Sequence, residues 1–189
     1  MNQRLPLVAQ WALMVIVSAC LFVGFFQLNG WALASFEYTP GVNWVFLPAG
    51  FRVLLVLILG LPGALGIVAG NLWLDHEQWM TGHAAPYFLA ALVSGMGPWA
   101  VRQWMVARGL LDKQLKDITL VRLVNFILVY AAVNAVFHQF IRWNFQISHS
   151  VPWVDIWPMF IGDVVGALAV LYVFKISLPW LRAWVRKRI

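Results

Sequence analysis

Charged side chains are scarce in this sequence. Only 11% of its 189 residues are charged and 62% are hydrophobic. A soluble domain carries about 25% charged residues. So few charges could not cover a water-facing surface, which argues against a soluble globular protein. The composition predicts an all-α protein, a polytopic bundle of membrane helices.

Cysteine is almost absent too. The one cysteine, Cys20, lies in an apolar run, so the chain can form neither an internal disulfide nor a pair of redox thiols. We expect Cys20 to act as a small apolar side chain. Basic residues outnumber acidic ones, 13 to 7, and they cluster beside apolar segments. This pattern indicates contact with the lipid bilayer and no nucleic-acid partner.

Long apolar runs are the main feature that is present. A membrane-spanning helix needs about 20 apolar residues, and the first run is too long for the core of a signal peptide. The GLPG sequence after the second run predicts a tight turn and an antiparallel helical hairpin. The expected spans, in a single membrane domain of residues 1–189, are 7–28, 44–60, 62–79, 84–105, 120–142 and 157–178.

The distribution of positive charge predicts the orientation. With both termini in the cytoplasm, all but two of the 13 Lys and Arg residues lie on the cytoplasmic side, as the positive-inside rule requires. We therefore expect six spans, N-in and C-in, in a bacterial inner membrane. The 106–118 loop is expected to be a short amphipathic interfacial segment. This loop and the basic tail RAWVRKRI are the expected contacts with anionic lipid or with a partner protein.

A few polar side chains lie within the expected spans, in the half nearer the periplasm. Ionisable groups in lipid are unfavourable and usually mark a functional site or a buried pair. A spacing of four residues places three of these side chains on one helical face. The candidate ligand-binding residues are Arg52, Asp163, His138, Asn134, Arg142 and Asn71.

Arg52 and Asp163 are expected at similar depths, so we predict an ion pair between them. The pair either only fixes the helix register or borders a pocket open to the periplasm. In such a pocket Arg52 or Arg142 would meet an anionic ligand group, with His138 and Asn134 as hydrogen-bonding groups. Pro48 is expected to loosen the second helix beside this pocket.

Two glycine pairs at helical spacing predict close backbone approach. They are Gly66 with Gly70 and Gly162 with Gly166, and they place the third and sixth helices inside the bundle. Ser94 and His138 would be the pair for serine proteolysis, but LVSGMG lacks the Gly of a GxSx motif. The histidines show no convergent metal-ligand spacing. We expect no metal, no cofactor and no catalysis.

Two segments resemble the MASE1 family of bacterial membrane sensor domains. NWVFLPAGFRVLLVLILGLPGALGIVAGNLW is similar to the Trp…Pro-Ala-Gly hairpin of that family, and FIGDVVGALAVLY is similar to its last helix with an Asp-x-x-Gly motif. The resemblance covers about residues 43–74 and 157–173. It implies a periplasm-facing sensor bundle and singles out Pro48, Ala49, Gly50, Asp163 and Gly166. Such domains usually have more helices and a fused kinase or cyclase, so the output is expected on another polypeptide.

The leading interpretation is therefore a non-catalytic inner-membrane protein that binds a small ligand in an outward-facing polar pocket and signals to a partner. One alternative is the substrate-binding subunit of a small-solute importer, with the polar pocket as the capture site. The other is a structural subunit of a larger membrane complex.

Overall fold

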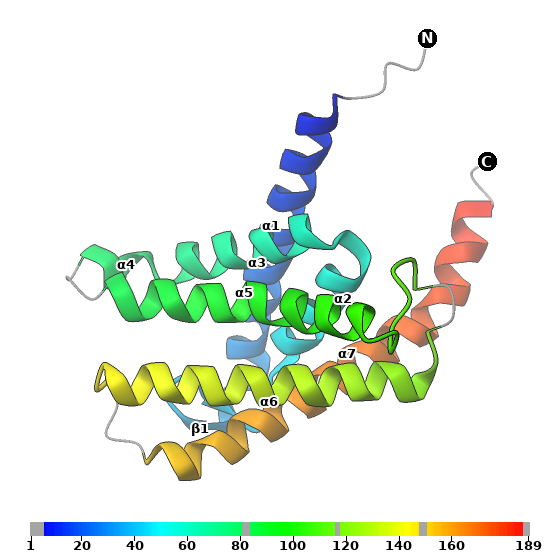
Figure 1. The fold of residues 1–189 in the computed structure, drawn as a ribbon. Coiled ribbons are helices and arrows are strands. Elements are labelled where there is room, and N and C mark those ends of the chain that lie inside the picture. The colour runs from blue at the N-terminus through cyan, green and yellow to red at the C-terminus, as the bar shows by residue number, and fades with distance from the viewer. Residues whose placement is uncertain (1–5, 81–83, 116–117, 148–150, 187–189) are drawn as a thin grey trace.

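The computed structural model describes residues 6–80, 84–115, 118–147 and 151–186. These residues are mostly helical (Figure 1). The elements, in chain order, are α1 (Leu7–Ala32), the short helix η1 (Ala34–Phe36), β1 (Glu37–Thr39), β2 (Val42–Asn43), α2 (Leu47–Leu59), α3 (Leu61–Leu74), α4 (His76–Met80), α5 (Ala84–Ala107), α6 (Leu120–Asn144) and α7 (Pro152–Arg186).

Four helices, α1, α5, α6 and α7, are long and apolar enough to cross a membrane. The segments predicted as the second and third spans are also helical, but α2 and α3 have only 13 and 14 residues. Each is about 20 Å long, whereas the hydrocarbon core of a bilayer is about 30 Å thick. The helix α3 is shorter than the predicted segment because it ends at Leu74, and α4 begins after Asp75.

Gly60 joins α2 to α3 with no intervening loop. Its φ of 64° is in the left-handed region, which glycine adopts without the steric penalty of a side chain. Pro62 follows in the first turn of α3, where its missing N–H breaks no helical hydrogen bond. The GLPG sequence therefore forms the predicted tight turn.

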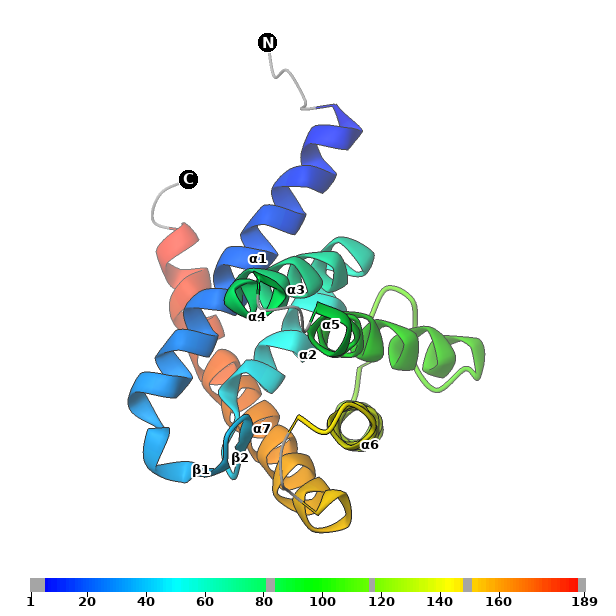
Figure 2. The ribbon, with the colours of Figure 1, turned by 90° about the vertical axis from the view of Figure 1, so that its left-hand side faces the viewer.

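The helix α1 crosses over α3 (Figures 1 and 2). The crossing is close because Gly66 and Gly70 lie in the contact: a Cβ atom at Gly66 would overlap Ser18, and one at Gly70 would lie 3.0 Å from Phe22 Cδ1. The Ser18 hydroxyl donates to the Gly63 carbonyl at 2.8 Å. The first glycine pair thus permits close helix packing, as its spacing predicts.

The second glycine pair also permits close backbone approach, as its spacing predicts. Gly162 and Gly166 of α7 lie against backbone, not against another helix: a Cβ atom there would overlap the carbonyl groups of Asn43 and Phe46. The Phe46 N–H also donates to the Gly162 carbonyl at 3.1 Å. These contacts hold the end of the β1–β2 hairpin and the start of α2 directly on α7.

Pro48 does not loosen α2, contrary to the prediction. It lies in the first turn, where the backbone nitrogen has no helical acceptor to lose. Residues 44–46 before α2 are not helical, and Asn29 of α1 accepts a hydrogen bond from the Leu47 N–H at 2.9 Å. Asn29, which is buried, therefore caps the start of α2 from another helix.

The first turn of α1 and the last turn of α7 lie at the top of both views, whereas the β1–β2 hairpin and the first turn of α7 lie at the bottom (Figures 1 and 2). We call the latter the hairpin end. In the segment predicted as interfacial, 106–118, the described residues after the end of α5 form turns and coil. Leu111 is buried in the core and Arg102 donates to the Lys113 carbonyl at 2.9 Å. The last residues of the basic tail lie outside the described residues.

Candidate functional site

Two adjoining cavities lie at the hairpin end. The larger one, the vestibule, has a volume of about 1000 Å³, and its polar lining includes Tyr38, Tyr87, Arg142 and Asp155. The smaller one, the inner chamber, has a volume of about 170 Å³. They adjoin because both are lined by Gly41, Tyr87, Ala90, His138 and Met159.

Arg52 lies in the wall of the inner chamber and is only 3% exposed. One of its amino groups, Nη1, donates to the Tyr130 hydroxyl at 3.2 Å. Its guanidinium carbon lies 5.3 Å from the centre of the Phe22 ring and 5.1 Å from that of Phe46. Both distances suit a cation–π contact, which partly replaces the water that a buried cation has lost.

Asp163 also lines the inner chamber and is 1% exposed. It accepts a hydrogen bond of 2.6 Å from the amide of Asn134. Asp163 and Arg52 share the chamber but make no direct ion pair, so the predicted pair is wrong. The reason is that α6 supplies each group with a nearer partner, Tyr130 or Asn134.

His138 lies where the two cavities meet. Its Nε2 atom is 3.2 Å from the hydroxyl oxygen of Ser94, which is buried on α5. Asn71 faces the inner chamber too, but its amide donates to the Ile67 carbonyl of its own helix at 2.9 Å. Asp75, just beyond α3, also lines this chamber, and burial raises its pKa to about 6.

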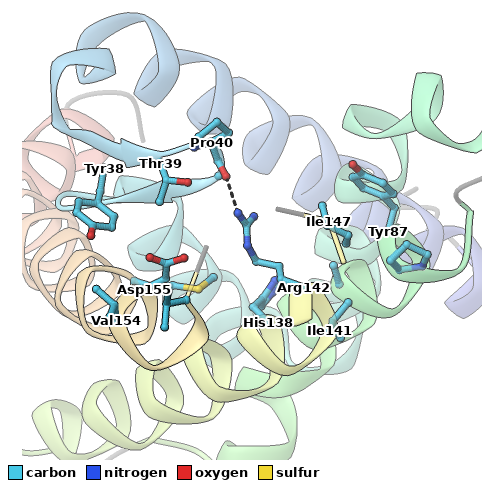
Figure 3. Close-up of a pocket in the computed structure, with 15 residues that line it drawn as sticks. Tyr38, Thr39, Pro40, Tyr87, His138, Ile141, Arg142, Ile147, Val154 and Asp155 are labelled. Carbon is cyan, nitrogen blue, oxygen red and sulfur yellow. Dashed lines mark hydrogen bonds between the residues drawn. The ribbon is translucent and has the colours of Figure 1, made fainter. Parts of the chain in front are cut away.

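Arg142 and Asp155 enter the vestibule from α6 and α7 (Figure 3). The Nη2 atom of Arg142 donates to the Pro40 carbonyl in the β1–β2 hairpin at 3.0 Å. Its Nε atom is buried and has no hydrogen-bond partner among the described residues. Asp155 is 3% exposed, and its Oδ2 atom likewise lacks a partner in the described part of the chain.

The six predicted site residues thus gather at one end of the bundle but divide between the cavities. Arg52, Asp163 and Asn71 line the inner chamber, Arg142 lines the vestibule and His138 lines both. Asn134 lines neither and supports Asp163 from behind.

Sequence reasoning missed Tyr130 and Asp155 as site residues. Tyr130 carried a usable signal, because it lies four residues before Asn134 on the same helical face. Asp155 follows directly on the apolar start of α7 and carried no such pattern. Nor did the sequence predict the β1–β2 hairpin, which supplies part of the vestibule wall.

Neither cavity brings together an obvious metal site. Within the residues that the structure describes, no three His, Cys, Asp or Glu side chains come close enough to hold a metal ion. No known protein family, curated protein or solved structure matches this chain. The function is therefore inferred from the residues themselves.

Proposed function

We propose that this chain is a multi-pass protein of a bacterial inner membrane whose vestibule opens to the periplasm. It binds a small ligand that carries an anionic group, and it passes the bound state to a partner protein without catalysing a reaction. One observation carries this proposal: in a chain that is 62% hydrophobic, buried polar side chains from several helices line two adjoining cavities at one end.

Charge distribution supports the proposed orientation. Of the 13 basic residues, only Arg52 and Arg142 belong to the periplasmic half of the proposed topology, which is the same whether α2 and α3 cross the bilayer or form a re-entrant hairpin. The remainder lie at the opposite end in that topology, which is the usual bias of cytoplasmic loops. The first turn of α1 and the last turn of α7 both lie toward the top of the two views, whereas α5 and α6 run across that direction (Figures 1 and 2).

The two segments that resemble MASE1 sensor domains pack against each other. The two similar segments lie far apart in the sequence, yet their motif residues touch. A Cβ atom at Gly50 would overlap Val170 of α7, and one at Gly166 would overlap the Phe46 carbonyl beside Pro48. Asp163, also singled out by the resemblance, faces the inner chamber at the same level.

The helix α7 offers a route from the cavities to a partner. It has 35 residues and is therefore about 50 Å long. Asp155 and Asp163 near its start line the cavities, and its last turns run past the other helices (Figure 1). A ligand that shifts the start of α7 would move its basic end, where we place the contact with the partner or with anionic lipid.

Side-specific labelling tests the orientation. Thr39→Cys in the vestibule wall and Gln114→Cys in the exposed 106–118 loop are each made in a Cys20→Ser background. A membrane-impermeant thiol reagent should label Thr39→Cys only in right-side-out vesicles and Gln114→Cys only in inside-out vesicles. Labelling of Thr39→Cys from the cytoplasmic side would contradict an outward-facing vestibule.

The adjoining cavities are also compatible with transport of a solute. A second experiment therefore separates sensing from transport. Mild-detergent purification followed by mass spectrometry should recover a kinase or cyclase partner. Proteoliposomes that contain the chain, with and without co-purified proteins, should show no uptake of radiolabelled solutes. Solute uptake would favour the importer interpretation over the sensor.

A further inference from the structure

The vestibule contains two opposite charges that are not in direct contact. Arg142 and Asp155 line the same pocket, yet they make no direct ion pair. Figure 3 shows the Arg142 side chain directed at the β1–β2 hairpin and the Asp155 carboxylate facing the pocket from α7. A buried charge without a partner is unfavourable, so the separation of these two groups needs a physical cause.

The hairpin supplies this cause. It holds the Arg142 guanidinium on the Pro40 carbonyl at 3.0 Å, and a Cβ atom at Gly41 would lie 3.1 Å from Nη1 of the same group. In the structure the guanidinium therefore lies against the hairpin and not against Asp155. One donor, Nε, and one acceptor, Asp155 Oδ2, stay unpaired in the same pocket.

This arrangement indicates the class of ligand. A simple anion would pair with Arg142 but would be repelled by the 97%-buried carboxylate of Asp155, and a simple cation would meet the reverse problem. A molecule with both charges satisfies both groups at once. Tyr38 and Tyr87 add aromatic walls, which suit the short apolar part of such a molecule.

We propose that the vestibule binds a small zwitterion, of the chemical class of a free amino acid, with its carboxylate at Arg142 and its ammonium group at Asp155. This inference rests on the proposed ligand-binding function and narrows its ligand. Asp155 becomes a ligand-binding residue that confers specificity for the ammonium group.

Matched probes test the inference without any mutation. The full-length chain in mild detergent is titrated with each of the protein amino acids, with their amides, which lack the carboxylate, and with the corresponding carboxylic acids, which lack the amino group. We expect at least one amino acid to raise the melting temperature and to bind in calorimetry. Its amide and its deaminated acid should each bind at least about tenfold more weakly, because each loses one charge-assisted interaction.

Two variants assign the charges, and one serves as a control. Arg142→Gln should bind the amino acid and its amide equally, and Asp155→Asn should bind the amino acid and its deaminated acid equally. Glu77→Gln, an exposed change on α4 outside both cavities, should bind like the parent. Unchanged discrimination in Arg142→Gln and Asp155→Asn would overturn the inference.

The titration distinguishes failure of this inference from failure of the proposed function. If carboxylic acids bind as tightly as amino acids, the zwitterion assignment is wrong, although an anion-binding pocket remains. If no amino acid and no carboxylic acid binds the parent protein, both proposals are wrong.

Discussion

The inner chamber and the vestibule contain similar charged side chains but differ in the partners that these side chains find. In the chamber, Arg52 pairs with Tyr130 and stacks on two rings, while Asp163 pairs with Asn134; only Arg52 Nε and Asn134 Oδ1 of these groups lack a partner among the described residues. In the vestibule, Arg142 makes one bond to a backbone carbonyl and Asp155 has no donor among the described residues. Each cavity holds one arginine and one aspartate, yet only the chamber supplies both with side-chain partners.

The difference indicates a division of labour. Buried polar groups that find partners within the protein fix the packing of helices. Charged groups that lack a side-chain partner are the ones that a ligand can satisfy. On this view Arg52, Asp163 and Asn134 hold α2, α6 and α7 together, whereas Arg142 and Asp155 bind the ligand and His138 lies at the junction.

The sharpest test of this division compares the two aspartates. Asp163→Ala should lower the free energy of unfolding by about 3 kcal/mol, because it leaves the Asn134 amide without its acceptor and Arg52 without a neighbouring negative charge. Asp155→Ala should change it by less than about 1 kcal/mol, since only a charge at a helix start is lost. Unfolding by denaturing detergent in mixed micelles measures both values.

The same pair of variants has a second readout. Thermal shifts with the amino-acid panel should fall in Asp155→Ala to those produced by the deaminated acids, and should persist in full in whatever fraction of Asp163→Ala remains folded. Equal losses of stability in the two variants would contradict the distinction between a structural chamber and a binding vestibule.

A smaller effect is expected from the tyrosine that bonds to Arg52. Tyr130→Phe keeps the packed ring, which is fully buried, and removes only the hydroxyl that accepts from Arg52. The expected loss is about 1.5 kcal/mol, the usual range for a hydrogen bond to a charged group. Tyr172→Phe, at an exposed position on α7, is the matched control and should unfold like the parent. A loss no greater than that of this control would mean that Arg52 finds another partner.

Much of the helical layout could be predicted because hydropathy acts locally. Each predicted apolar segment contains a helix, and the GLPG turn and the Gly66–Gly70 contact follow from residues a few positions apart. The sequence also predicts that the polar groups gather at one end, because polar side chains in a membrane are unfavourable where they face lipid and therefore share a common interior.

The partners of those groups could not be predicted in the same way. Arg52 bonds to Tyr130, and Asp163 to Asn134, because the rotation of α6 about its axis presents that face between them. Depth alone, which the sequence does indicate, placed Arg52 and Asp163 together but left rotation open. Asn29 capping α2 and the β1–β2 hairpin depend on contacts between distant segments, for which the local pattern carries no signal.

The smallest predicted effect concerns Asp75, which lies just past α3 on the edge of the inner chamber. Burial raises its pKa from 3.8 to about 6. The folded protein therefore binds a proton that the unfolded chain has already released between these values, so stability falls as the pH rises from about 4 to about 6. Because the Asp75 carboxyl is partly exposed, the fall in stability attributable to it is about 1 kcal/mol or less.

The free energy of unfolding, measured against pH for the parent and for Asp75→Asn across this range, should differ in slope, with the variant flatter by that amount. Equal slopes would mean that water reaches Asp75, at the edge of the chamber, as freely as it reaches the vestibule. The contrast between the chamber and the vestibule would then hold only for their more deeply buried residues.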